Sequence, residues 1–382
     1  MKTKFQLAAL ALLLSTLNSQ LSTCLGQGAL TPPGPPAPTM KSLAQIEART
    51  PISTAPFTIT QPGSYYLTTN VTVSGGNAIT IATNGVTLDL NGFSISSTEA
   101  SPTGTAILLN GSLRNITIAN GLIQGGVTNN GSGVYSGPGF ANGIYCSGSQ
   151  PINARVSGIS VSGCQYDGID LGHSGTVVEG CVVQTVGGYG IVAGSVSDST
   201  AENFGNSGVY AYTANNCYGS SSAIGGGVIA DTAINCRGSS SSGNGVYATT
   251  ANNCYGSSSS GNGVYAFTAN NCYGSSSSGT GVYAWYTATG CYGSSSSGTG
   301  LFAPAALNCN GSSSGSGSGV SASIANNCYG YSSSGYGVGV SFTATGCDGY
   351  SYSGTGLYAF IANVCHGTGN PGLSSPHPVN SY

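Results

Sequence analysis

A repeat of 18 or 19 residues fills residues 208–366 and constrains the fold more than any other feature of this sequence. Each of its nine units starts with an aliphatic anchor and carries one cysteine. The anchors are Val209, Val228, Val246, Val264, Val282, Leu301, Val320, Val338 and Leu357, and the cysteines are Cys217, Cys236, Cys254, Cys272, Cys291, Cys309, Cys328, Cys347 and Cys365. A unit this short cannot bury its own apolar face, so the units must stack as coils of a solenoid.

The composition alone would suggest disorder, because 63 of 382 residues are glycine and only 4% are charged. The strict period excludes that interpretation. Beyond Glu202 the charged residues are Asp231, Arg237 and Asp348. Such a surface cannot neutralise phosphates, so we expect no nucleic-acid partner.

Residues 1–26 have the layout of a secretory signal peptide. Lys2 and Lys4 precede the apolar run 7–17, and small residues follow around Cys24. A lipid anchor at Cys24 is the disfavoured alternative. We therefore expect an exported, extracellular or cell-surface protein, and no later stretch is apolar for long enough to span a membrane.

The remaining chain divides by its repeat pattern. The expected segments are a proline-rich leader and N-terminal cap at 27–56, with one short helix at Met40–Arg49, and a β-helix at 57–366, made of irregular coils (57–200) and regular repeats (201–366). Residues 367–382 form a tail that is either a loose end or a thin cap.

One unit predicts the path of its coil. Val246 and Ala248 point inward and Tyr247 outward, as in a strand. A second strand is expected at Thr250–Asn252, and a turn at Gly256–Gly261. The position before each cysteine is Asn or Gly in eight of the nine units, which indicates a left-handed backbone bend. The ninth unit has Val364 there, which we expect to be strained.

Successive coils should pair in parallel, about 4.8 Å apart, so that identical residues form columns. The segment Gly85–Ser94, the recurring Gly-Ile/Val starts and the Asn bends resemble all-β, right-handed parallel β-helix proteins of the pectin-lyase-like class. More narrowly, Thr31-Pro32-Pro33-Gly34 and the Ala-Asn-Asn-Cys-Tyr-Gly repeats resemble secreted bacterial repeat proteins with no assigned activity. The repeat itself predicts coils of 18–19 residues in the C-terminal half, and the less regular segments before it predict longer coils. The resemblance implies little about chemistry, because this fold hosts many functions.

Twelve cysteines remain once the signal peptide is removed: Cys146, Cys164, Cys181 and the nine of the regular repeats. In an oxidising compartment they could pair as disulfides. The alternative, which we favour, is a reduced or mixed column in which buried thiols act as small hydrophobes. A linear column does not converge on a metal, so we expect no metal and no cofactor.

Asp167, Asp170 and His173 are the best catalytic candidates, because paired carboxylates near a histidine could serve polysaccharide cleavage. Their segment is also an ordinary start of a coil, and we favour that scaffold interpretation. The other charged residues, Arg155, Glu179, Glu202 and Arg237, are too scattered to suggest a lyase site.

Two outward aromatic columns are the binding candidates. Rings at a regular rise could stack on sugars, or they could stabilise the solenoid by stacking on one another, which we favour. The residues are Tyr210, Tyr247, Tyr265 and Tyr283 after the aliphatic anchor, and Tyr218, Tyr255, Tyr273 and Tyr292 after the cysteine. We expect a structural or adhesive protein whose partner is a polysaccharide or cell-surface component; the alternative is a polysaccharide lyase or glycoside hydrolase.

Overall fold

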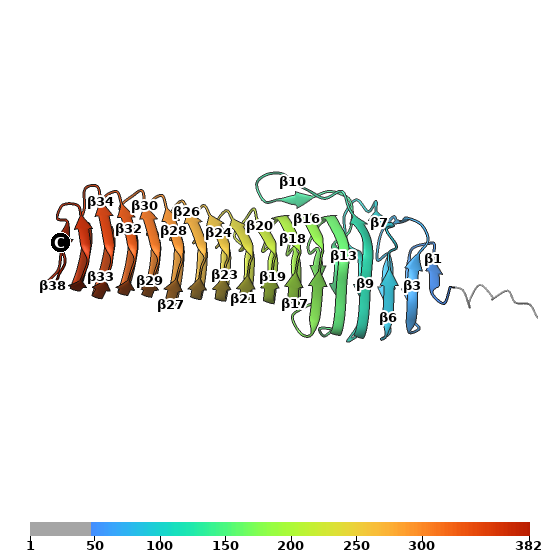
Figure 1. Ribbon diagram of the computed structural model, residues 1–382. Coiled ribbons are helices and arrows are strands. Elements are labelled where there is room, and N and C mark those ends of the chain that lie inside the picture. The colour runs from blue at the N-terminus through green and yellow to red at the C-terminus, as the bar shows by residue number, and fades with distance from the viewer. Residues whose placement is uncertain (1–46) are drawn as a thin grey trace, which may run out of the picture. The chain divides into compact units, whose positions relative to one another are not determined.

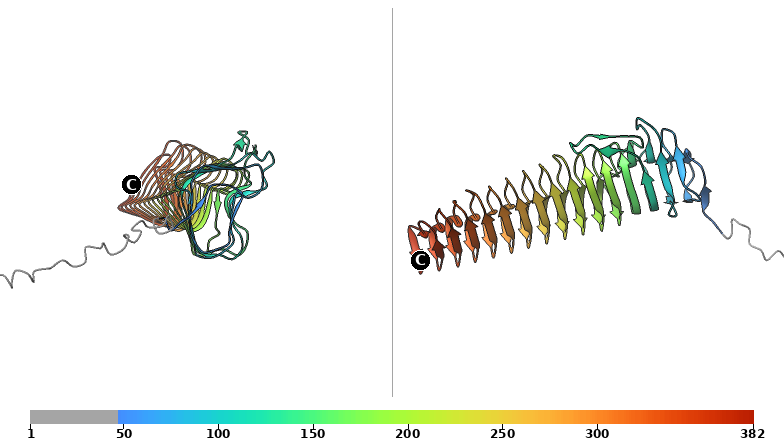
Figure 2. Two further views of the ribbon diagram at one scale, coloured as in Figure 1. Left: turned by 90° about the vertical axis from the view of Figure 1, so that its right-hand side faces the viewer. Right: turned by 90° about the horizontal axis from the view of Figure 1, so that it is seen from above.

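Neighbouring coils pair in parallel and in register, which makes the chain a β-helix. The computed structural model describes residues 47–382. Val246 pairs with Val228 and Val264, and Tyr247 pairs with Tyr265. Of the strands in this part of the chain, 36 belong to one continuous sheet that winds through the stacked coils (Figures 1 and 2). The expected all-β parallel β-helix is confirmed, and no helix occurs within residues 47–382.

Each coil of the regular array consists of one long strand and one short strand. The long strands are β19 (Val209–Asn215), β21 (Val228–Ile234), β23 (Val246–Asn252), β25 (Val264–Asn270), β27 (Val282–Thr289), β29 (Leu301–Leu307), β31 (Val320–Asn326), β33 (Val338–Thr345) and β35 (Leu357–Asn363). The short strands are β20 (Tyr218–Ser221), β22 (Arg237–Ser240), β24 (Tyr255–Ser258), β26 (Tyr273–Ser276), β28 (Tyr292–Ser295), β30 (Asn310–Ser313), β32 (Tyr329–Ser332), β34 (Asp348–Ser351) and β36 (His366–Thr368).

The N-terminal coils are longer, as expected. Val86 pairs with Ile116 and Ile116 with Ala154, steps of 30 and 38 residues, whereas Ile191 pairs with Val209 at a step of 18. The strands of this half are β1 (Thr50–Ile52), β2 (Phe57–Ile59), β3 (Gly63–Leu67), β4 (Val71–Val73), β5 (Ile79–Ile81), β6 (Val86–Asp89), β7 (Ser94–Ser97), β8 (Thr105–Leu109), β9 (Arg114–Gln124), β12 (Asn142–Cys146), β13 (Ile152–Cys164), β14 (Ile169–Asp170), β15 (Thr176–Glu179), β16 (Val182–Val186), β17 (Ile191–Ser197) and β18 (Thr200–Phe204).

The interior of the array is narrow. Val246, Ala248 and Cys254 are at most 2% exposed, which confirms the inward positions expected from the sequence. Gly256 also points inward, and a Cβ added there would lie 1.9 Å from the carbonyl oxygen of Gly263. Only glycine fits, because the two walls of the coil touch through their backbones at this point.

Two details of the predicted coil are wrong. Thr250–Asn252 is not a separate strand but the end of β23, and the chain does not turn at Gly256, since β24 continues to Ser258. The missed feature is Ser258, which is 8% exposed and points inward. A run of four serines resembles a polar loop, and only the pairing of β24 with β22 and β26 shows that its first half is strand.

The bend before each cysteine has the predicted backbone conformation. Asn253 has φ of 53° and Gly290 of 63°. Val364 adopts the same left-handed conformation, with φ of 52°, although its branched side chain disfavours it. The strain expected in the last unit is therefore present.

An antiparallel hairpin of β10 (Thr128–Asn129) and β11 (Tyr135–Ser136) leaves the N-terminal coils and lies over the later ones (Figure 1). The Tyr135 hydroxyl lies 3.0 Å from Ser222 Oγ, and Asn129 Nδ2 donates to Asn203 Oδ1 at 2.8 Å. These polar contacts fix the hairpin to coils that follow it by about 70 to 90 residues in the sequence.

The ends of the described chain are strands. At the N-terminal end β1 pairs with β3, and Glu47–Arg49 are not helical. The rest of the expected helix, the signal peptide and most of the leader lie outside the described residues.

The C-terminal tail is a cap and not a loose end, because β37 (Leu373–Ser374) and β38 (His377–Val379) both pair with β35. No helix in residues 47–382 is long and apolar enough to cross a membrane.

Candidate functional site

The first aromatic column is a continuous stack over four coils. The rings of Tyr247 and Tyr265 lie 5.1 Å apart with planes 7° from parallel, and Tyr265 and Tyr283 repeat this geometry at 5.1 Å and 6°. Phe302 extends the stack at 4.8 Å. Within the stack each ring face contacts the next ring, so solvent reaches mainly the ring edges.

The second column forms an equivalent ladder. Tyr255 and Tyr273 stack at 5.0 Å, and Tyr273 and Tyr292 at 4.9 Å. One coil carries Arg237 in place of an aromatic residue, and its guanidinium lies 5.0 Å from the Tyr255 ring centre and 5.8 Å from that of Tyr218. A cation between two ring faces preserves the column. This geometry gives both columns a structural role.

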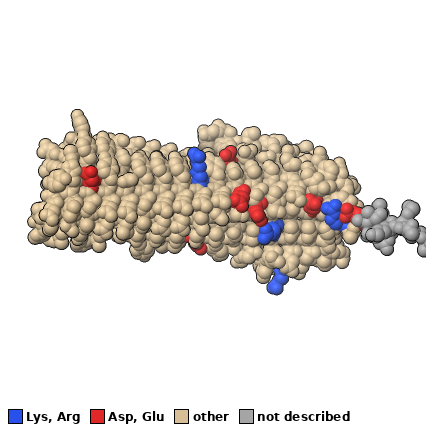
Figure 3. All heavy atoms as spheres, viewed as in Figure 1, with Lys and Arg blue, Asp and Glu red and all other residues tan. Residues whose placement is uncertain are grey.

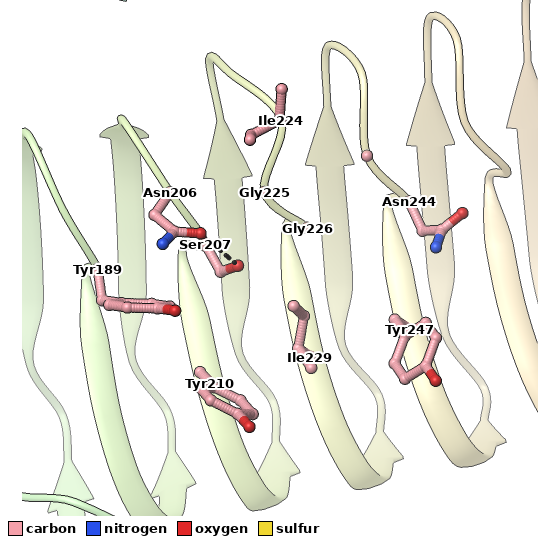
Figure 4. Close-up of a pocket in the computed structure, with 11 residues that line it drawn as sticks. Tyr189, Asn206, Ser207, Tyr210, Ile224, Gly225, Gly226, Ile229, Asn244 and Tyr247 are labelled. Carbon is pink, nitrogen blue, oxygen red and sulfur yellow. Dashed lines mark hydrogen bonds between the residues drawn. The ribbon is translucent and has the colours of Figure 1, made fainter.

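The first column is interrupted at Ile229, which lies in register between Tyr210 and Tyr247. Those two tyrosines are therefore two coils apart, about 9.6 Å along the axis. A groove of about 400 Å³ opens at this break (Figure 4). Its lining residues are Tyr189, Asn206, Ser207, Tyr210, Ile224, Gly225, Gly226, Ile229, Gly243, Asn244 and Tyr247.

Glycines and amides shape the groove. Val228 and Val246 are paired in neighbouring coils. Two residues before them, the first coil has Gly226 and the second has Asn244, so the glycine takes the place of an asparagine. In Figure 4, Asn206 and Asn244 lie on either side of this glycine segment, above the row that contains Tyr210 and Tyr247. Ser207 Oγ is 3.5 Å from Asn206 Oδ1. Ile224 is 82% exposed at the rim. None of the lining residues is charged.

Asp167 and Asp170 are both half-buried and engaged in local hydrogen bonds. Asp167 Oδ1 accepts from the Tyr189 amide at 2.8 Å, and Asp170 Oδ1 accepts from the Gly172 amide at 2.9 Å. Burial raises the pKa of both carboxyl groups, and for Asp167 the neighbouring charge of Asp170 adds to the rise. Asp170 thus stabilises its own turn, whereas Asp167 connects its coil to the next one, and both contacts are structural.

The three catalytic candidates border the groove without lining it. Asp170 pairs with Val192, which pairs with Tyr210, so the carboxylate is two coils from the groove wall on the same column. The His173 ring meets the Tyr210 ring edge-on at 4.4 Å, and its buried Nε2 has no hydrogen-bond partner. The sequence brought Asp167, Asp170 and His173 together, but it did not indicate the contact of His173 with Tyr210.

The cysteines form a ladder of free thiols, but not all belong to it. Cys181 and the nine array cysteines share one column, in which Ser199 fills the missing step and Cys254 Sγ donates to Ala233 O at 3.4 Å. Cys164 pairs instead with Val186 in a different column, and Cys146 pairs with Leu109. Burial raises the pKa of Cys164 to about 12 and that of Cys181 to about 11.

A second inward column escaped the sequence interpretation. The hydroxyl of Ser276 donates to Gly261 O at 2.7 Å in the preceding coil and accepts from the Gly279 amide at 2.8 Å. The same two contacts, to a carbonyl of the preceding coil and from the amide three residues later, are made by Ser240, Ser258, Ser295, Ser332 and Ser351. The spacing of each serine from its cysteine, four residues, was the available signal.

Charged groups are few on the surface shown in Figure 3. Arg155 pairs with Glu179 at 2.7 Å, so these two are engaged with each other. Within residues 47–382, no three His, Cys, Asp or Glu side chains are grouped so as to hold a metal ion.

Comparison of the chain with protein-family models, with curated proteins and with solved structures found no match.

Proposed function

We propose that this protein is an exported structural and adhesive β-helix that binds uncharged glycans in the groove between Tyr210 and Tyr247. The observation that carries this is the interrupted aromatic column. Inside the ladders the ring faces are covered by other rings, whereas Ile229 stands between Tyr210 and Tyr247 and a groove opens at this interruption (Figure 4). Export rests on the signal-peptide pattern of residues 1–26.

The groove has room for a sugar ring. Its volume is about 400 Å³. Tyr210 and Tyr247 are about 9.6 Å apart along the axis, and the Ile229 side chain between them leaves free the space that a tyrosine would fill (Figure 4). Ile229 is shorter than a tyrosine and supplies an apolar floor. The Nδ2 groups of Asn206 and Asn244 supply donors for sugar hydroxyls, since Asn244 Oδ1 already accepts from Asn262. The uncharged lining favours a neutral ligand over an acidic one.

Cleavage of the glycan is the second candidate activity. The raised pKa of Asp167 and Asp170 and their proximity to the groove are the observations in its favour. Their engagement with backbone amides favours a structural role instead, and binding without cleavage is our proposal.

The test uses protein starting at Gln27 with insoluble and soluble glycans, read for retention and for released product. Ile229→Tyr should weaken retention, because a tyrosine there continues the stack and fills the gap. Asn310→Tyr is the matched control, since it extends the second column between Tyr292 and Tyr329, away from the groove. Retention that is absent, or equal in the Ile229→Tyr variant and the wild type, would overturn the proposal. Product that disappears with Asp170→Asn would establish the enzyme.

A further inference from the structure

A second break occurs in the same aromatic column, nearer the C-terminus. After Phe302 the column continues with Ser321 and Gly339 before Tyr358 restores an aromatic ring. A smaller groove of about 220 Å³ opens there, lined by Ser318, Ser321, Tyr336, Gly339, Val340, Ser341 and Tyr358.

This groove shares an uncharged lining of tyrosine and glycine with the first, but here the two tyrosines contact each other. Its aromatic wall is formed by Tyr336 and Tyr358, whose rings lie 5.5 Å apart and are tilted by 33°. Its floor contains a glycine, and a Cβ on Gly339 would lie 3.1 Å from the Tyr336 ring. Serine hydroxyls take the place of the asparagine amides, and no lining residue is charged.

The register fixes the separation of the two grooves. Ile229 and Gly339 occupy one column and are connected through Tyr247, Tyr265, Tyr283, Phe302 and Ser321. Six coil steps at about 4.8 Å place the grooves about 29 Å apart along the axis.

The surface between the grooves is also suited to hydroxyl-rich chains. The stacked rings of Tyr247, Tyr265 and Tyr283 belong to it, and the half-exposed Trp285 packs edge-on against the last two. Beside them runs a half-buried polar row in which Asn262 Nδ2 donates to Asn244 Oδ1 at 3.1 Å and the Thr280 amide donates to Asn262 Oδ1 at 3.0 Å. Polar groups thus continue from one groove to the other.

We infer that the two grooves are subsites for one linear, uncharged polysaccharide that lies parallel to the β-helix axis. This inference rests on the proposed function and adds to it the ligand's shape and minimum length. A chain that reaches both grooves binds the second one intramolecularly, so its affinity should exceed that of a short fragment by about 10²-fold or more.

The experiment measures affinity and stoichiometry for di- to octasaccharides and longer members of the cello-, manno- and chito-oligosaccharide series. Short members should bind two per chain, each with weak affinity. Members longer than about 29 Å should bind one per chain with the increase in affinity. Ser321→Tyr, which extends the stack from Phe302 into the second groove, should reduce short-fragment binding to one per chain and abolish the increase; Ile229→Tyr should do the same from the other side. Asn310→Tyr should change neither quantity.

The outcomes separate this inference from the proposed function. If short fragments bind one per chain in an Ile229-dependent manner, and neither length nor Ser321→Tyr has an effect, the second subsite is refuted and the first groove stands. If no member of any series binds, both proposals fail.

Discussion

The rings of Tyr247 and Tyr265 lie 5.1 Å apart and are 7° from parallel, close to the rise of one coil. Each ring therefore covers the face of the other, which stabilises adjacent coils but leaves little face for a ligand. Tyr247 has no such partner on its other side, because Ile229 occupies that coil. The interruption of a stabilising column is what creates the candidate site.

Ile229→Tyr should raise the thermal midpoint even as it closes the groove. The new ring would stack on Tyr210 and Tyr247, and an aromatic pair contributes about 0.5–1.5 kcal/mol beyond the area it buries. Calorimetry of the variant and of Ile229→Ala would measure the difference. A lower midpoint for the tyrosine variant would mean that the coil geometry at the break does not accept a ring.

Ser276→Ala should destabilise its coil by about 1–3 kcal/mol, because the Gly261 carbonyl and the Gly279 amide would lose their buried partner. Ser278→Ala, at an exposed position of the same turn, is the control. Hydrogen exchange of the amides in neighbouring coils is the appropriate measurement, since solenoids open locally. Equal exchange in the two variants would contradict the structural role of the buried hydroxyl.

Val364→Asn should stabilise the last coil by about 1 kcal/mol. Valine in the left-handed conformation costs about 1–2 kcal/mol, and this side chain is 61% exposed, so its removal loses little packing. Val379→Asn makes the same change at an exposed position of β38. The prediction fails if Val364→Asn does not slow hydrogen exchange in β35 relative to this control.

The buried thiols should resist alkylation in the folded protein. With its pKa raised to about 12, Cys164 holds almost no thiolate at pH 8, and burial also blocks access. Iodoacetamide labelling followed by mass spectrometry should modify the half-buried Cys146 first and the other cysteines only after denaturation.

The folded protein holds the thiol proton of Cys164 more tightly than the unfolded chain does. The contribution of Cys164 to the free energy of unfolding should therefore be complete below pH 9 and be lost between pH 9 and about 12. Early labelling of Cys164 would refute its assignment to the core.

Asp167→Asn should raise stability at neutral pH. The raised pKa means that the ionised carboxylate is disfavoured in the folded protein, so the cost is present above the folded pKa and disappears as the group protonates. The amide oxygen of asparagine can still accept from the Tyr189 amide. Thermal midpoints should therefore differ from wild type at pH 7 and converge below the ordinary value of 3.8. Asp231→Asn makes the same change at an exposed position and is the control.

The repeat predicted much of the coil because the relevant signals are local. The alternation at Val246, Tyr247 and Ala248 defines a strand face, and the asparagine or glycine before each cysteine marks a bend whichever coils lie beside it. The inward glycine and serine of β24 could not be predicted in this way. Gly256 is required by the approach of Gly263 O, and Ser258 is inward because its hydroxyl reaches Gly243 O of the preceding coil at 2.7 Å.

The sequence by itself determined that the chain is a solenoid, where its coils repeat and which residues form columns, because a fixed period combined with parallel pairing places identical positions above one another. Only the tertiary structure decided which columns are continuous. It separated Cys164 from the thiol ladder, placed Arg237 between two rings, and opened a groove at Ile229. These outcomes depend on the distance between side chains in different coils, which residue spacing along the chain does not specify.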